Sequence, residues 1–203
     1  MRCLYCDEEI NEYSIYSLLF EEDYLCQKCR KSLKYHYQKI MIEDMEVEIF
    51  YDYDSLFKDV LLQYKECYDE ALKKVFLYKI KDYLMIKYHN YNIMYVPSSI
   101  KKREERGFNH LKEIFEELKL KEIGGIQMKE DISQLSKGYK DRLKMENNFI
   151  YKGDIHPNNL LIVDDVYTTG SSIKGVYKAM KPYCKKIKAV VLAKTWQYNW
   201  KLR

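Results

Sequence analysis

The stretch from residue 55 to about residue 88 carries apolar side chains at intervals of three and four positions. That spacing gathers them on one face of a helix, so the pattern predicts helical structure with a buried stripe. A further stripe of the same period predicts a helix between Phe108 and Leu118. The apolar positions in these stripes are Leu56, Val60, Leu61, Tyr64, Leu72, Val75, Phe76 and Ile80, followed by Phe108, Leu111, Ile114, Phe115 and Leu118.

Three continuous apolar runs predict strands that are buried on both faces. Between the second and the third run, a helix is expected to extend to about Tyr183, with Ser171 or Ser172 as its cap. Strand, loop, helix and strand in this order predict an α/β fold with a parallel sheet. The three runs are Asn92–Pro97, Leu160–Val163 and Ile187–Ala193.

The remaining segments are expected to connect these elements. Residues 39–54 are acidic and mixed in character, and we interpret them as a connector into the main domain. The pair Gly124-Gly125 marks a turn. Residues 129–148 are polar and basic without a clear period, which predicts a long loop. Loops of that length in a compact domain are usually functional lids or disordered.

The composition of the chain sets its class. With 203 residues, 47% of them hydrophobic and 33% charged, the chain suits one α/β domain of about 150 residues plus a small appendage. The formal net charge of +4 permits a polyanionic partner without requiring one. No secretory signal and no apolar run of about 18 residues is visible, so no membrane span is expected. We therefore expect a cytoplasmic protein with reduced thiols.

Four cysteines form two C-x-x-C pairs near the N-terminus. Two such pairs match a tetrahedral Zn²⁺ site, in which four thiolates leave no open position for catalysis. A redox pair is the alternative, although redox folds rarely carry two copies this close together. The prediction is a structural zinc module over residues 1–38, followed by the main domain over residues 39–203. The predicted ligands are Cys3, Cys6, Cys26 and Cys29, whereas Cys67 and Cys184 are read as core or surface thiols whose role the sequence leaves open.

The richest chemistry follows the second apolar run. Asp164 and Asp165 leave the predicted strand at its carboxyl end, where open α/β sheets bind their ligands. A short segment with hydroxyl side chains and Gly170 then leads into a helix N-terminus, whose free amides and positive end suit a phosphate dianion. A phosphate site and a carboxylate pair this close together would recognise a ribose 5-phosphate. The alternative is an ordinary turn in which the acids cap the helix.

A second candidate segment follows the first apolar run. Backbone amides after the strand, together with several basic side chains, can receive a diphosphate. The alternative is a solvated start to a helix. The candidate diphosphate-binding residues are Ser98, Ser99, Lys101, Arg103 and Arg106.

The stretch from Val163 to Ser172 resembles the ligand-binding motif of type I phosphoribosyltransferases: four hydrophobic residues, two acids and a loop rich in Thr and Gly. The resemblance implies that family's parallel-sheet fold, with 5-phosphoribosyl-1-diphosphate (PRPP) as the ligand. It implies that Asp164 and Asp165 form the catalytic pair on the ribose hydroxyls, and that Mg²⁺ bridges the diphosphate and the ribose. The residues that it places around the 5-phosphate are Tyr167, Thr168, Thr169, Gly170 and Ser171.

The string Arg106-Gly107-Phe108-Asn109, preceded by Val-Pro and a basic spacer, resembles the signature of the ComF competence family. Leu62-Gln63-Tyr64-Lys65 resembles that family's upstream helix. Its flexible-loop segment is matched by Gln134, Arg142 and Phe149, with Lys144 near the position where the family usually has Asn. ComF proteins similarly carry an N-terminal zinc finger.

The resemblance implies a PRPP-binding protein of natural competence that helps move single-stranded DNA inward. It implies a competence helicase and DNA-processing proteins as partners, and a cytoplasmic location that extends to the inner membrane face through those partners. The alternative is an active phosphoribosyltransferase, which would transfer ribose 5-phosphate to a base or amine that the sequence does not name. Residues 39–90 are the expected place for a hood that binds such an acceptor.

The long loop offers one further choice. Its basic side chains surround Tyr139, and basic residues with an aromatic suit single-stranded nucleic acid. The same residues would instead close over the diphosphate in a PRPP-binding protein. The basic residues concerned are Lys137, Lys140, Arg142 and Lys144.

Overall fold

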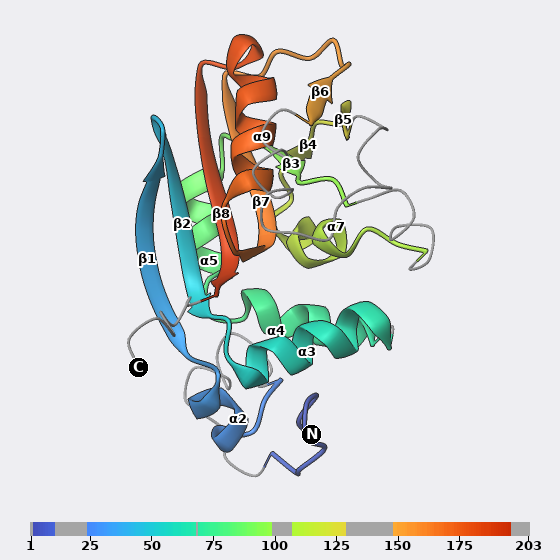
Figure 1. Ribbon diagram of the computed structural model, residues 1–203. Helices are drawn as coiled ribbons and strands as arrows, with labels where there is room; N and C mark the ends of the chain where they lie inside the picture. The colour runs from blue at the N-terminus through green and yellow to red at the C-terminus, as the bar shows by residue number, and fades with distance from the viewer. Residues whose placement is uncertain (1, 11–23, 68, 99–106, 129–147, 196–203) are drawn as a thin grey trace, which may run out of the picture.

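The computed structural model describes residues 2–10, 24–67, 69–98, 107–128 and 148–195. Within these ranges the chain forms a six-stranded sheet in the order β1-β2-β8-β7-β3-β4 (Figure 1). The neighbours β1 and β2 are antiparallel, and the other neighbouring pairs are parallel. The predicted α/β fold with a mostly parallel sheet is therefore confirmed. The strands are β1 (Tyr35–Ile42), β2 (Met45–Asp52), β3 (Asn92–Tyr95), β4 (Lys121–Glu122), β7 (Asn159–Tyr167) and β8 (Lys186–Lys194).

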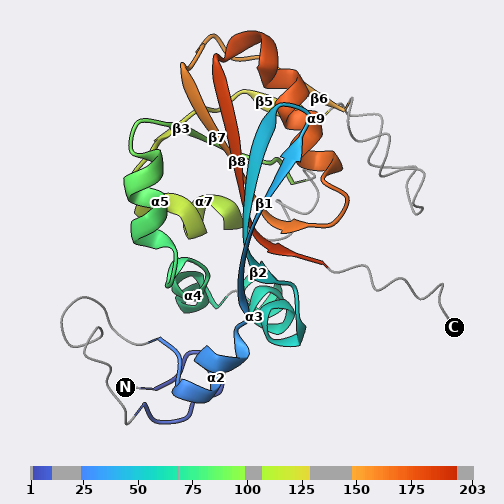
Figure 2. The ribbon, with the colours of Figure 1, turned by 90° about the vertical axis from the view of Figure 1, so that its left-hand side faces the viewer.

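Helices cover both faces of the sheet. Figure 2 shows α9 on one face and α5 with α7 on the other. The helices α3 and α4 lie across the carboxyl ends of the strands, and α2 lies beyond them (Figure 1). None of the helices in the described ranges combines the length and apolar character needed to cross a bilayer. The helices are α2 (Gln27–Ser32), α3 (Ser55–Glu66), α4 (Lys73–Leu77), α5 (Lys81–Tyr88), α7 (His110–Phe115) and α9 (Ser171–Met180), with 3₁₀ turns at Glu70–Leu72, Glu116–Leu118 and Lys181–Tyr183.

The two central strands, β7 and β8, form the middle of the core. The side chains of residues 160–163 and 189–193 are buried, as expected for parallel strands that are covered on both faces. All three predicted strands are present. The helical stretch after residue 55 is also present, but it is divided into α3, a 3₁₀ turn, α4 and α5.

Two sequence interpretations of local structure are wrong. Residues 39–54 are not a connector, because β1 and β2 pair as a hairpin over most of this range. The strand β1 begins at Tyr35 and so crosses the position at which the sequence placed a domain boundary. The helix α9 is not capped by Ser171 or Ser172. Gly170 is its N-cap residue, with a φ of 74° in the left-handed region that favours glycine.

A short antiparallel pair, β5 (Ile126–Met128) with β6 (Phe149–Tyr151), lies apart from the main sheet. The last residue of β5 pairs with the first residue of β6. The two ends of the predicted long loop are therefore held side by side. Most of that loop, residues 129–147, lies outside the described residues.

A buried carboxylate explains why the hairpin was hard to see in the sequence. Glu48 on β2 is 0% exposed, although an acid in a mixed segment usually indicates a surface. Tyr88 and Tyr83 donate hydrogen bonds of 2.6 and 2.7 Å to it, Tyr37 donates another, and Lys87 Nζ lies 2.6 Å from its Oε1. Burial opposes ionisation of Glu48, but these partners hold its pKa at about 2. The carboxylate thereby joins the hairpin to α5.

We expect Glu48→Ala to lower the free energy of unfolding by about 3–5 kcal/mol, because it leaves a buried lysine and three tyrosine hydroxyls without their acceptor. Glu48→Gln should cost less, since the amide oxygen still accepts hydrogen bonds. Urea denaturation followed by circular dichroism measures both effects. The matched control is Glu46→Ala, which removes a more exposed carboxylate from the same strand and should cost about 1 kcal/mol or less.

The pH dependence of this contribution has a definite sign. The folded pKa of Glu48 lies below its usual value of 4.5, so its stabilisation is complete above about pH 4.5 and is lost as the pH falls toward 2. Unfolding midpoints measured across this range should show a component that is missing in Glu48→Gln. Equal midpoints for wild type and Glu48→Ala at neutral pH would contradict the proposed role of the carboxylate.

Candidate functional site

The four predicted zinc ligands come together in space. The sulfur atoms of Cys3, Cys6, Cys26 and Cys29 all lie within 4.8 Å of one another. Cys6 Sγ lies 3.6 Å from Cys26 Sγ and 3.5 Å from Cys29 Sγ. Four sulfurs placed tetrahedrally at about 2.3 Å from a zinc ion would be about 3.8 Å apart. The sequence-predicted cluster could therefore hold one zinc ion with little rearrangement.

The chain around the cysteines is shaped to present sulfur atoms. The Cys3 amide donates to the Glu8 carbonyl at 2.9 Å, and the Asp7 amide donates to the Cys3 carbonyl at 3.0 Å. Asp7 has a φ of 58°, which turns the chain back on itself after the first pair. Burial opposes ionisation of Cys3, but the amides of Cys26, Cys6 and Tyr5 bring the pKa of its thiol down to about 7. A thiolate held by backbone amides is the form that binds zinc.

The aspartate pair lies where the sequence predicted it, in the last part of β7. Asp164 Oδ1 accepts a 2.9 Å hydrogen bond from the Asp165 backbone amide. The adjacent strand β3 runs parallel, with Tyr95 opposite Val163, and the Val96 amide donates to the Val163 carbonyl at 3.0 Å. Both candidate segments of the sequence therefore leave the sheet side by side at its carboxyl edge.

Asp165 has two cationic or polar partners from distant parts of the chain. Lys65, in the last turn of α3, forms an ion pair with Asp165 Oδ2. His110 Nε2, from the first residue of α7, lies 2.8 Å from the same oxygen. The side chains of Lys65 and Asp165 are each 14% exposed and that of His110 is 5% exposed. Tyr64 braces the arrangement, since its hydroxyl donates to the His110 carbonyl at 3.1 Å.

The two adjacent carboxyls are driven to opposite protonation states. Burial raises the pKa of Asp164 well above its usual range, and the negative charge of Asp165 adds to the effect. Burial would also raise the pKa of Asp165, but the hydrogen bond from His110 and the charge of Lys65 hold it well below its usual range. At neutral pH the pair then offers one neutral carboxyl, which can donate, and one carboxylate, which can only accept.

The loop after β7 makes a tight turn into α9. Thr169 Oγ1 and Ser171 Oγ are 2.8 Å apart, and the Ser171 amide donates to Thr169 Oγ1 at 3.4 Å. Thr168 is exposed, whereas Ser171 is buried. A Cβ at Gly170 would lie 2.7 Å from the Tyr167 ring, so the close approach of this ring requires glycine. Of the predicted phosphate-binding residues, Thr168 thus faces solvent and Tyr167 packs over the turn.

The second candidate segment borders a small cavity of about 160 Å³. Ser98, Phe108, Asn109 and His110 are among its lining residues. Asn109 also caps α7, because its side chain accepts a hydrogen bond from the Lys112 amide at 3.3 Å. The cavity reaches the aspartate pair through His110, which contacts both. The other predicted residues of this segment and of the flexible loop, Ser99, Lys101, Arg103, Arg106 and Arg142, lie outside the described residues.

Comparison with known proteins adds one relative. No family model matches the chain. The chain is 25% identical over 207 residues to the protein named Competence protein ComFC of Streptococcus pneumoniae (strain ATCC BAA-255 / R6), a match that covers 89% of this chain and 94% of that protein. This relative supports the ComF family. The match extends over most of the chain, as the ComF resemblance in the sequence also did.

Two residues of the site were not predicted as part of it. Lys65 was noted only within the helix that resembles the ComF pattern, and His110 was set aside because the histidines show no ligand spacing. A signal for both was present, since Lys65 ends one ComF-like string and His110 directly follows another. Their convergence on Asp165 depends on the packing of α3 and α7, which no local pattern reveals.

We expect the purified chain to carry one zinc ion, and Cys29→Ser to lose most of it because three thiolates bind less tightly than four. Metal analysis after gel filtration measures the stoichiometry. Cys67→Ser is the matched control, because Cys67 is an exposed thiol outside the cluster and its loss should leave the zinc content unchanged. A full zinc content in Cys29→Ser would count against the cluster as the metal site.

Removal of the Lys65 charge should raise the pKa of Asp165, because an opposite charge favours the ionised carboxyl. Carboxyl ¹³C NMR titration of Lys65→Met against wild type measures the change. Lys73→Met is the control, since Lys73 pairs with Glu113 and Glu116 instead. The stability that this pair provides is present above the usual aspartate pKa and disappears on acidification, so the variant should lose its advantage at neutral pH and converge with wild type in acid. An unchanged Asp165 titration would contradict this account.

Proposed function

We propose that this chain is a PRPP-binding, phosphoribosyltransferase-like protein that acts in natural competence. The observation that carries the ligand assignment is the aspartate pair at the carboxyl edge of the sheet, followed directly by a hydroxyl-rich turn and the start of α9. The observation that favours competence is the likeness to the protein named Competence protein ComFC over most of both chains.

The unequal protonation of the aspartates suits a ribose diol. Asp165, ionised and held by Lys65 and His110, would accept hydrogen bonds from the sugar hydroxyls. Asp164, neutral at ordinary pH, would donate one. Lys65 then acts as a positioning residue, because it keeps Asp165 charged inside a partly dry site. The pair can bind a sugar without two like charges repelling each other.

The turn between β7 and α9 would hold the 5-phosphate. Amides at the start of a ten-residue helix and the hydroxyls of Thr168 and Thr169 are donors of the kind that phosphates bind. The basic side chains predicted for the diphosphate, Lys101, Arg103, Arg106 and Arg142, would neutralise the charge of the leaving group. Each of these four roles remains a proposal, since it rests on residues outside the described ranges.

Mg²⁺ in this proposal accompanies the ligand. Asp165 Oδ2 already faces Lys65 and His110, and Asp164 is neutral, so the pair is poorly suited to hold a bare cation by itself. The diphosphate and ribose oxygens would supply the remaining ligands that Mg²⁺ prefers. Its chemical contribution, when bound, would be to neutralise the diphosphate.

In the competence role, the protein would work on the cytoplasmic side, with single-stranded DNA, a competence helicase and DNA-processing proteins as partners. The PRPP site would then serve as a ligand sensor. If the chain is an active transferase instead, PRPP must lose diphosphate in the presence of a base or amine. A panel of nucleobases and amines, with diphosphate release as the readout, separates the two roles.

We expect PRPP with Mg²⁺ to bind in isothermal calorimetry, and Asp164→Asn with Asp165→Asn to weaken binding by at least about 100-fold. Two charge-assisted or buried hydrogen bonds, each worth about 1.5–3 kcal/mol, support that magnitude. The control is Asp154→Asn, which changes an exposed aspartate outside the site and should bind as wild type. Zinc content and circular dichroism should show that the double variant is folded.

The Thr168→Val variant tests the phosphate side independently, because it removes an exposed hydroxyl without changing charge. We expect a loss of about tenfold, in keeping with one hydrogen bond to a charged group. Wild-type heat in the double aspartate variant would refute the PRPP site. Absence of binding by the wild-type chain would refute the proposed ligand.

A further inference from the structure

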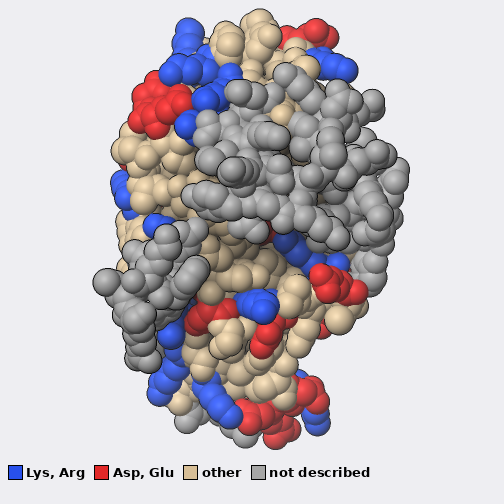
Figure 3. All heavy atoms as spheres, viewed as in Figure 1, with Lys and Arg blue, Asp and Glu red and all other residues tan. Residues whose placement is uncertain are grey.

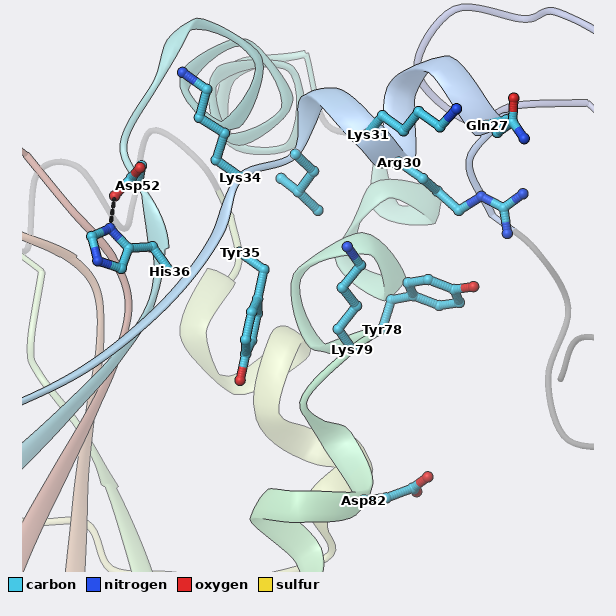
Figure 4. Close-up of a pocket in the computed structure, with 11 residues that line it drawn as sticks. Gln27, Arg30, Lys31, Lys34, Tyr35, His36, Asp52, Tyr78, Lys79 and Asp82 are labelled. Atoms are coloured by element: carbon cyan, nitrogen blue, oxygen red, sulfur yellow. Dashed lines mark hydrogen bonds and ion pairs between the residues drawn. The ribbon is translucent and has the colours of Figure 1, made fainter. Parts of the chain in front are cut away.

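A large groove lies on a different part of the molecule from the aspartate pair. Its volume is about 1170 Å³, and it runs between α2, the start of β1 and the junction of α4 with α5 (Figure 4). None of its described lining residues belongs to β7, α9 or the segment after β3. The proposals for PRPP therefore do not use it.

Basic side chains gather in this groove from three elements. Arg30 and Lys31 belong to α2, Lys34 precedes β1, and Lys79 lies between α4 and α5. No ion pair joins Lys31, Lys34 or Lys79 to an acidic residue within the described part of the chain. In Figure 4 the amino group of Lys79 points toward α2, whereas Lys34 points away from it. Partial burial and the nearby Arg30 lower the pKa of Lys79.

The concentration of positive charge is local. The face shown in Figure 3 carries basic and acidic side chains in mixed order over its described parts. In the groove, the acidic lining residues are Asp52, which pairs with His36 at 3.0 Å, and Asp82, whose side chain points away in Figure 4. Lysines held close to other cations without acidic partners leave a positive potential that an anionic ligand would neutralise.

Two aromatic rings stand among these cations. Tyr35 is 49% exposed, and Tyr78 is partly exposed. Figure 4 shows the Lys79 side chain between the two rings. Each ring is braced from behind: Tyr51 lies edge-on to Tyr35 at 6.0 Å, and Tyr24 lies edge-on to Tyr78 at 6.0 Å. Fixed, exposed rings beside lysines form a surface on which unpaired bases stack while the backbone phosphates meet the cations.

We propose that this groove binds single-stranded nucleic acid, with Lys31 and Lys79 on the phosphates and Tyr35 and Tyr78 against the bases. The choice of a nucleic acid strand rests in part on the proposed role in competence. An acidic polypeptide would satisfy the cations but would leave the rings without a flat partner. A duplex hides its bases from the rings, so it would use the charge alone. The basic loop around Tyr139 is a separate candidate, and the groove does not depend on it.

The test uses the full-length, zinc-loaded chain and a fluorescein-labelled oligothymidylate, with binding followed by fluorescence anisotropy over a series of salt concentrations. Lys31→Glu with Lys79→Glu should weaken binding at least tenfold. The double variant should also reduce the slope of log affinity against log salt by about 1.4, at roughly 0.7 for each lost phosphate contact. Tyr78→Leu should weaken binding about tenfold with the slope unchanged, because stacking is not ionic.

Matched controls separate the groove from general charge. Lys152→Glu with Lys186→Glu changes the net charge by the same amount at exposed positions outside the groove, and it should bind as wild type. The double aspartate variant of the PRPP site should also bind the oligonucleotide as wild type. The nucleic-acid result and the PRPP result can therefore fail independently.

Three outcomes would overturn the proposal. The first is no binding of the oligonucleotide by the wild-type chain. The second is wild-type affinity in the groove variants, especially if charge reversal at Lys137, Lys140 and Lys144 abolishes binding instead. The third is displacement of the oligonucleotide by polyglutamate or by duplex DNA as effectively as by the unlabelled single strand, which would assign the groove to an acidic chain or to the duplex.

Discussion

The buried carboxylate of Asp165 joins three elements that are far apart in the sequence. Lys65 reaches it from α3 and His110 from α7, while Asp165 itself ends the central strand β7. An ionised carboxyl in such a place is costly unless it is paired and hydrogen-bonded, so the helices must pack where these partners can reach it. The same pairing leaves Asp164 neutral, which gives the sheet edge a donor and an acceptor side by side.

A second buried carboxylate plays the corresponding part at the other end of the sheet. Glu48 is neutralised by Lys87 and by three tyrosine hydroxyls, and it fixes the β1–β2 hairpin to α5. These tyrosines therefore give part of the chain's unusual tyrosine content a structural reason. Because the hairpin adds its strands next to β8, it also carries the start of β1 to the edge of the basic groove.

The zinc module has a structural role that extends beyond its own fold. Cys29 lies within α2, and the two basic residues that follow it line the groove. A metal that fixes Cys29 would also fix the direction of Arg30 and Lys31. The proposed PRPP site and the proposed nucleic-acid groove lie on opposite sides of α3 and α4, which cross the carboxyl ends of the strands (Figure 1). These helices are the physical connection through which one site would sense the other.

The sequence alone determined the features that depend on local pattern. Apolar runs predicted the strands β3, β7 and β8, the cysteine spacing predicted the metal cluster, and the adjacent acids marked the end of β7. Only the tertiary structure decided the partners of the buried charges. Glu48 was read as a connector acid and His110 as an unremarkable histidine, because the environment of a charge depends on elements that pack against it from distant parts of the chain. The groove, likewise, exists only because three separate elements place their lysines and tyrosines around one space.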